Sequence, residues 1–270
     1  MGRNSVLQLC CAALLATRGP DALTVRLQPL TNEAFDADVR STGERFERRL
    51  RQGPFLWVDE SAERKRQVLH GKILAEPLVG RGDIAVPDGL IHDWIGAAFI
   101  PGVTLPKTLA MVQDYDHHAE AYKPEVLASR LISRHDDDFH ISMRLLKKQI
   151  LTVVLDTEHE VQYRKVDDER WYSRSRTLRI AEVLDPGTNT ERLLPPGVGH
   201  GFLWRLNSYW KFAERDGGVY IECEPISLTR DVPTGLGWII NPIIRSFPRD
   251  SLINSLRKTR AAVQQAPGSH

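Results

Sequence analysis

The sequence predicts an α+β fold in which one curved antiparallel sheet wraps around a long C-terminal helix. Three observations lead to this prediction. After residue 88, apolar runs of strand length follow one another, with turn-forming residues between them. The pair Asp216–Gly217 is a strong signal for a two-residue hairpin turn between two such runs. Residues 250–264 instead repeat their apolar side chains at helical spacing.

The strand pattern can be followed along the chain. We expect strands over residues 90–100, 126–133, 139–146, 150–155, 161–163, 172–184, 202–213 and 219–229. A short helix is expected over 105–113. A break near residues 242–248 should precede the C-terminal helix, because proline is disfavoured inside helices.

The N-terminal part predicts a mainly helical extension. Apolar residues recur at helical spacing over 31–52, and 60–70 reads as a second, short helix. Residues 76–89 are rich in Gly and Pro, which indicates a linker. We therefore expect an extension and linker at 20–85, a sheet domain at 86–265 and a disordered tail at 266–270.

Residues 1–19 resemble a short secretory signal peptide. Arg3 gives a positive start, and a mostly apolar stretch follows over residues 5–16. The cleavage signal is poor, because Leu14 would stand where a small residue is preferred. A secreted or periplasmic protein is the expectation. The alternative is a cytoplasmic protein with a weakly amphipathic N-terminus.

Composition excludes several classes of protein. The 270 residues hold 36 Lys and Arg against 35 Asp and Glu, so the net charge is +1 and no nucleic-acid partner is expected. No apolar run approaches the length of a membrane-spanning helix. Cys10 and Cys11 lie in the possible signal peptide, which leaves Cys223 alone and supports neither a disulfide framework nor a cysteine metal site.

The Asp216–Gly217 turn sets the register of one hairpin. It pairs Trp210 with Cys223 and Lys211 with Glu222, so that the two strands separate into an apolar face and a polar face. We expect the C-terminal helix to cover the apolar face and water to cover the polar one. The apolar face holds Trp204, Leu206, Trp210, Phe212, Ile221 and Cys223. The polar face holds Arg205, Asn207, Tyr209, Lys211, Glu222 and Glu224.

Other strings of polar residues carry groups that are capable of chemistry. His135–His140 and Asp114–His118 contain imidazoles and carboxylates that could bind a metal, but polar turns explain them more simply. Glu222 and Glu224 share a face and could act as an acid–base pair, although cross-strand charge pairing is the simpler explanation. A solvated face, an acidic partner or a membrane surface could account for the basic residues Arg144, Lys147, Lys148, Arg174, Arg176 and Arg179. We expect no catalytic residue, no metal and no cofactor.

The chain resembles the START and polyketide-cyclase-like (SRPBCC) superfamily, which has the helix-grip fold. The resemblance rests on the strand at 89–96, the break at 100–102, the segments 112–116 and 122–126, the paired strands 204–212 and 218–228, and the closing helix from residue 248. It covers about residues 86–265, and more narrowly it suits bacterial members with an N-terminal extension. It implies an apolar ligand cavity and carries no catalytic signature.

The sequence and the resemblance leave three hypotheses for the function open. The first is non-catalytic binding or transport of a hydrophobic small molecule, which could be lipid-like, quinone-like or polyketide-like. The second is a cyclase or aromatase that uses the same cavity, and the third is a structural module whose core is filled by its own side chains. A transient contact with a membrane surface is a further expectation. The candidate ligand-binding residues are Trp94, Phe99, Phe139, Trp204, Trp210, Phe212, Ile221 and Cys223.

Overall fold

The computed structural model describes residues 24–148, 152–231 and 237–266, apart from the side chains of 237–246. The possible signal peptide lies outside the described residues, as does nearly all of the expected tail. The helical elements are α2 (Pro29–Gln52), η2 (Trp57–Glu60), α3 (Ala62–Leu69), α4 (Leu105–Gln113), η3 (Tyr115–His117), α5 (His118–Ala121) and α6 (Gly237–Gln265). The strands of the main sheet are β2 (Leu74–Pro77), β3 (Asp83–Val86), β4 (Gly89–Pro101), β5 (Val126–His135), β6 (Asp138–Lys148), β7 (Thr152–Lys165), β8 (Arg170–Leu184), β9 (Arg192–Leu193), β11 (Arg205–Arg215) and β12 (Gly218–Arg230).

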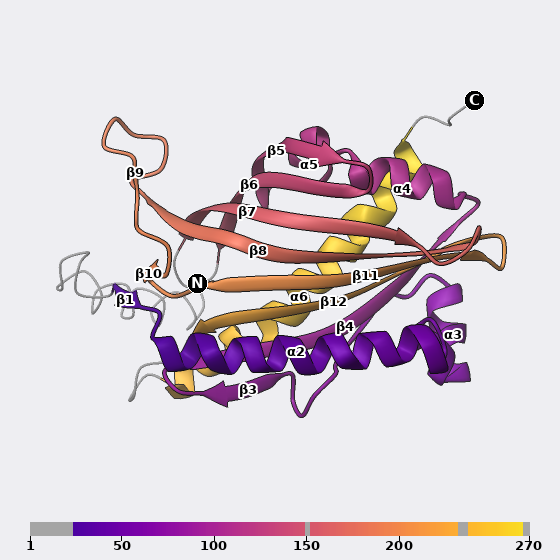
Figure 1. Cartoon of the computed structure of the whole chain (residues 1–270), viewed down its shortest axis with the longest axis horizontal. Coiled ribbons are helices and arrows are strands. Elements are labelled where there is room, and N and C mark those ends of the chain that lie inside the picture. The colour runs from indigo at the N-terminus through magenta and orange to yellow at the C-terminus, as the bar shows by residue number, and fades with distance from the viewer. Residues whose placement is uncertain (1–23, 149–151, 232–236, 267–270) are drawn as a thin grey trace, which may run out of the picture.

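One antiparallel sheet organises the molecule (Figure 1). Its strand order is β2-β4-β12-β11-β8-β7-β6-β5, with β3 also paired to β4 and β9 to β8. A separate two-stranded ribbon joins β1 (Val25–Arg26) to β10 (Val198–Gly199). The α+β class and the order of the elements are as the sequence predicts.

The predicted hairpin register is confirmed. Trp210 pairs with Cys223, Lys211 with Glu222 and Phe212 with Ile221. Asp216 and Gly217 both have positive φ, at 56° and 78°, which is the conformation that a type I′ hairpin turn requires.

Three expectations about the elements are wrong. Residues 152–155 and 161–163 belong to one strand, β7, because the alternation of buried side chains continues between them through Thr157 and His159. The C-terminal helix is not broken, because α6 runs through Pro242 and Pro248. The expected linker at 76–89 contains β3 and the end of β2, and both strands pair with β4, so the sheet extends across the predicted boundary at residue 86.

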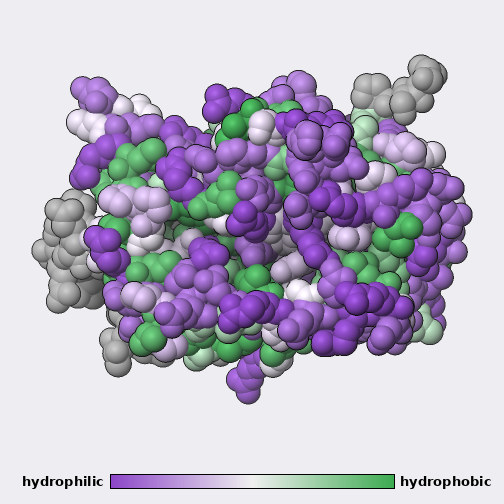
Figure 2. All heavy atoms as spheres, in the orientation of Figure 1, coloured by the Kyte–Doolittle hydropathy of each residue, from purple (hydrophilic) through white to green (hydrophobic). Residues whose placement is uncertain are grey.

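Helices cover both faces of the sheet. The C-terminal helix α6 packs on one face, where Leu252, Leu256 and Val263 join the main core. On the other face α2 lies along β4, β12 and β11, and buries Phe35 and Phe46 there (Figure 1). Figure 2 shows mainly hydrophilic residues along the band where α2 faces the viewer. Among the described residues, no helix combines the length and apolarity needed to cross a membrane.

The expectation of a wet polar face is therefore wrong. Lys211, Glu222 and Glu224 are each no more than 2% exposed, because α2 and η2 lie over them. The carboxylates on this strand face form ion pairs that are buried beneath the N-terminal extension, so water does not cover the face. The partner charges come from α2, more than 170 positions away in the sequence.

Gly96 allows α6 to approach the sheet closely. A Cβ atom at this position would lie 2.7 Å from the carbonyl oxygen of Leu74 and 2.9 Å from a methyl carbon of Leu256. We expect Gly96→Ala to lower the free energy of unfolding by about 1–3 kcal/mol, since the backbone oxygen cannot move without shifting β2. The matched control is Gly43→Ala in α2, where nothing lies within 4 Å. Chemical denaturation should show a gain in stability for the control, and equal effects of the two substitutions would contradict close packing at Gly96.

Candidate functional site

A pocket lies between the sheet and α6. Its volume is about 420 Å³. Residues of β6, β7, β8, β11 and β12 line its sheet side, while α6 and the segment from α4 to α5 line the opposite side. The loop before β11 contributes Phe202 and Leu203. Such a volume lies in the lower part of the usual range for small-molecule sites.

Small side chains on the sheet leave this space open. Several side chains of β8, β11 and β12 that face the pocket are serine or cysteine rather than large apolar residues. Because Ser175 is directly opposite Ser208 across the β8–β11 pair, the two short side chains meet without filling the gap below α6. The small residues that line the pocket are Ser173, Ser175, Ser208, Cys223 and Ser227.

Large aromatic residues line the inner end of the pocket. The hydroxyl oxygens of Tyr115 and Tyr163 lie 2.9 Å apart, and Tyr163 also donates to the carbonyl oxygen of Val112. Burial raises the pKa of both phenols, so they stay uncharged. Phe212 lies next to Tyr163, with ring centroids 6.5 Å apart. The inner wall is therefore apolar, and its hydroxyl groups are already hydrogen-bonded.

Two histidines line the pocket in uncharged form. Burial lowers the pKa of His118 and of His159 to about 4 in each case. His118 packs between the rings of Tyr115 and Tyr122, and its Nε2 atom is buried without a hydrogen-bond partner in the described part of the chain. A neutral imidazole can donate or accept one hydrogen bond from each nitrogen, according to its tautomer. These side chains can therefore orient a polar group of a ligand.

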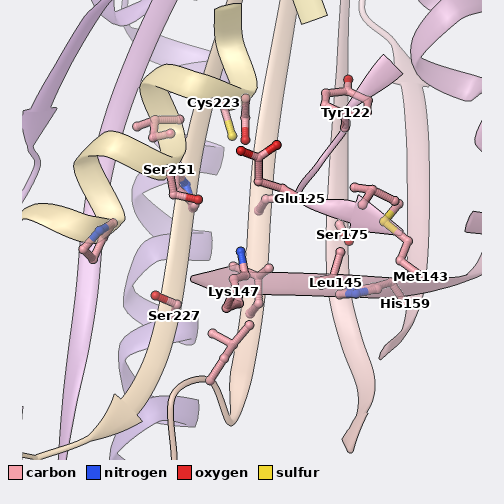
Figure 3. Close-up of a pocket in the computed structure, with 18 of the residues that line it drawn as sticks. Tyr122, Glu125, Met143, Leu145, Lys147, His159, Ser175, Cys223, Ser227 and Ser251 are labelled. Carbon is pink, nitrogen blue, oxygen red and sulfur yellow. The ribbon is translucent and has the colours of Figure 1, made fainter. Parts of the chain in front are cut away.

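Charged residues gather at the half-buried end of the pocket. Figure 3 shows Lys147, at the end of β6, and Glu125, just before β5, reaching into the same space. Glu125 pairs with Lys258 and accepts a hydrogen bond of 2.9 Å from Asn254, both on α6. Burial lowers the pKa of Lys147, and the charge of Glu125 partly opposes that shift.

The structure divides the predicted ligand-binding residues into three groups. Trp210, Phe212 and Cys223 line the pocket. Three others belong to the core cluster on the same side of the sheet but do not line the pocket: Trp94, Phe139 and Ile221. Phe99 and Trp204 lie in clusters on the other side, beneath the N-terminal extension.

The last two placements correct the prediction, and each has a physical cause. On β4 the even-numbered side chains face α6, so Phe99 faces away and packs against Tyr220 with ring centroids 4.7 Å apart. Trp204 precedes the first residue of β11, Arg205, and strand alternation does not extend to it. It packs instead among residues that include Phe35 of α2.

The sequence did not predict that His118, His159 and Lys147 line the pocket, although His118 stood in a possible metal-binding segment and Lys147 among the basic strand residues. A signal existed for the two strand residues. Lys147 continues the alternation of Ile141, Met143 and Leu145 on β6, and His159 continues that of Val161 and Tyr163 on β7. His118 begins the short helix α5, and no periodicity in the sequence indicates its direction.

The two segments with metal-binding residue types do not gather ligands. Among the described residues, no group of three His, Cys, Asp or Glu side chains could hold a metal ion. His135 is largely exposed at the end of β5, and His140 lies 3.5 Å from Glu158 on the next strand. Four of the basic strand residues form ion pairs instead: Arg144, Arg174, Arg176 and Arg179.

A second cluster of titratable groups is buried between α2 and the sheet. Arg45 of α2 donates to Asp93 at 2.8 Å and to Glu224 at 2.6 Å. Arg49 donates to Glu222 at 3.0 Å, and Lys211 donates to the carbonyl oxygen of Phe55 at 2.8 Å. None of these residues lines the pocket. The cluster therefore attaches the N-terminal extension to the sheet and is separate from the candidate site.

The pH dependence of stability should report on Asp93. Burial and the neighbouring charge of Glu224 raise the pKa of Asp93 to about 7, although Arg45 opposes the shift. The folded protein thus keeps a proton that the unfolded chain loses near pH 4. Asp93 should make the free energy of unfolding fall as the pH rises from about 4 to 7, by up to about 1.4 kcal/mol per pH unit.

Asp93→Asn should flatten this part of the stability profile. The measurement is urea denaturation at several values of pH, with the exposed Asp168→Asn as the control. Burial raises the pKa of Glu224 as well, so some of the slope should remain in the Asp93→Asn protein. Identical slopes for the wild type and Asp93→Asn would contradict the proposed protonation of Asp93.

Comparisons with known proteins find similarity in structure alone. No protein-family model matches the sequence, and no curated protein matches it. The structure is similar to a STAR-related lipid transfer protein from Xanthomonas axonopodis, with a TM-score of 0.46 and 15% identity over 68% of this chain and 99% of that chain. It is also similar to human STARD10, with a TM-score of 0.43 and 10% identity over 81% of this chain and 85% of that chain.

A third similar structure is the Zhui aromatase/cyclase from Streptomyces sp. R1128. The TM-score is 0.42 and the identity 7%, over 65% of this chain and 94% of that chain. Similarities of this size do not transfer a ligand or an activity. The observed order of elements, with an antiparallel sheet against a C-terminal helix, is that of an α+β helix-grip fold.

Proposed function

We propose that this protein binds an apolar small molecule in the pocket between the sheet and α6, and that binding rather than catalysis is its role. One observation supports this most strongly. The pocket of about 420 Å³ exists because serine and cysteine occupy much of its sheet side, while aromatic side chains line its inner end. A structural module with a self-filled core would gain stability from larger residues at these positions.

The charge states of the lining residues favour binding over acid–base catalysis. A catalytic acid or base works best when its pKa lies near the working pH. His118 and His159 have pKa values near 4, far below neutral pH. Glu222 and Glu224, the two carboxylates that share a strand face, lie on the other side of the sheet with α2 over them. A cyclase or aromatase remains the alternative, and turnover of a polyketide-like substrate would support it.

Trp210→Ala tests the proposal, because the Trp210 ring lines the pocket and stacks on Phe212 at a centroid distance of 6.1 Å. The wild type should bind a fluorescent fatty-acid probe in the micromolar range, roughly −8 kcal/mol. Trp210→Ala should bind at least about 10-fold more weakly, a loss of about 1.4 kcal/mol.

Trp204→Ala is the matched control. It removes the same side chain from the opposite side of the sheet, where Trp204 packs with the α2 cluster and not with the pocket. Its probe affinity should equal that of the wild type at a temperature where both variants are folded. Equal losses for the two variants would indicate a general effect on the core and would contradict a binding role for Trp210.

A further inference from the structure

The pocket-facing side of β6 changes from apolar to cationic along its length. Ile141, Met143 and Leu145 line the pocket in succession, and Lys147 follows them at the end of the strand. From Ile141 to Lys147 the strand advances six residues, roughly 20 Å at about 3.3 Å per residue. The pocket is therefore elongated, with an aromatic inner end and a charged, half-buried outer end.

Carboxylates act on the other cations at the outer end. The lining residues there include three cations, Lys147, Lys258 and Arg230, and two carboxylates, Glu125 and Asp231. Lys258 is paired with Glu125, and the carboxylate of Asp231 acts on its neighbour Arg230. His200 also lines this end and contacts Glu182, which does not line the pocket. Among the described residues, no carboxylate forms an ion pair with Lys147, and the nearest counter-charge that acts on it, that of Glu125, is already paired with Lys258.

The surroundings of Lys147 suit an anion. Among the described residues, its Nζ atom forms neither a hydrogen bond nor an ion pair, and it lies 5.7 Å from the ring centroid of Phe247. A desolvated ammonium group gains from a charged partner more than an exposed one does. Ser227 and Ser251 line the same part of the pocket (Figure 3), and their hydroxyl groups can donate hydrogen bonds to anionic oxygens.

We infer that the ligand is a single-chain amphiphile whose anionic oxygen head group pairs with Lys147 while its apolar part occupies the inner end of the pocket. This inference rests on the proposed function. The volume of about 420 Å³ favours one chain over the two chains of a membrane phospholipid. A carboxylate and a phosphate monoester share the required chemistry, and a comparison of head groups separates them.

The experiment compares ligands that differ only in the head group. Palmitate, hexadecyl phosphate and the neutral methyl palmitate would each displace a fluorescent apolar probe from the full-length protein. The wild type should prefer at least one of the two anions to the ester by about 10-fold or more, and the preferred anion identifies the head group. Equal affinity for all three ligands would overturn the inference but would leave the proposed function standing.

Lys147→Gln tests the residue itself. It should weaken binding of the preferred anion by about 10-fold or more and leave the affinity for methyl palmitate within about twofold. Lys147→Arg should keep the preference for the anion. Lys148→Gln is the matched control, because it removes the same charge from the next residue, which is exposed on β6.

The outcomes separate the role of Lys147 from the proposed binding of an apolar molecule. Unchanged anion binding by Lys147→Gln would overturn the role of Lys147, whatever the apolar probe does. Failure of the wild type to bind any of the three ligands or the probe would overturn both the inference and the proposed function. Thermal unfolding of each variant establishes that a lost affinity is measured on folded protein.

Discussion

Arg45→Met should lower the free energy of unfolding by about 3–5 kcal/mol, because it leaves two buried carboxylates without their cation. Arg45 donates to Asp93 at 2.8 Å and to Glu224 at 2.6 Å, and both carboxylates are buried. Methionine keeps most of the length of the side chain, but it has neither the positive charge nor the hydrogen-bond donors that stabilise the two buried carboxylates. The measurement is chemical denaturation near neutral pH.

Two comparisons isolate the charge from the packing. Arg48→Met alters an exposed residue of the same helix and should change stability by no more than about 0.5 kcal/mol. Asp93→Asn combined with Glu224→Gln in the Arg45→Met background should recover much of the loss, since the unpaired charges are then gone. A loss from Arg45→Met no larger than that of Arg48→Met would show that the buried ion pairs do not hold α2 on the sheet.

Ser208→Phe should abolish ligand binding, with a loss of about 100-fold or more, equivalent to about 2.7 kcal/mol. Ser208 lines the pocket in the centre of the sheet, opposite Ser175 on β8 and Pro225 on β12. A phenyl ring there would take up space that we assign to the ligand. Because the ring fills an existing pocket, the free energy of unfolding should stay the same or rise.

The control for Ser208→Phe is Ser142→Phe. Ser142 lies on β6 between Ile141 and Met143, so its side chain is on the face of the strand away from the pocket. This variant introduces the same aromatic group without entering the pocket and should bind the probe as the wild type does. Normal probe binding by Ser208→Phe would place the ligand elsewhere and contradict the assignment of the site.

The hairpin illustrates what the sequence could predict. The Asp216–Gly217 turn, together with the strict alternation of apolar and polar residues on both sides of it, predicted the pairing of β11 with β12. The structure confirms this register. The same reasoning failed at Trp204, where the strand has not yet begun. Local patterns thus located the strands and their register, but not the exact residue at which alternation starts.

The environment of the polar strand face could not be predicted from the strands alone. Lys211, Glu222 and Glu224 form the same pattern whether water or a charged helix covers them. Their burial depends on Arg45 and Arg49, which are brought to the sheet by the tertiary packing of α2. In the same way, the pocket depends on the distance at which α6 packs, and that distance is not encoded in the alternation of any single strand.

The most direct test of the central claim is native mass spectrometry of the purified protein before and after extraction with organic solvent. We expect the wild type to carry or to rebind one apolar molecule per chain, seen as a mass increase that extraction removes, and we expect Ser208→Phe to show none. A folded wild type that carries nothing extractable and binds none of a broad panel of apolar molecules would contradict the account, and would leave a structural module in which the pocket has no ligand.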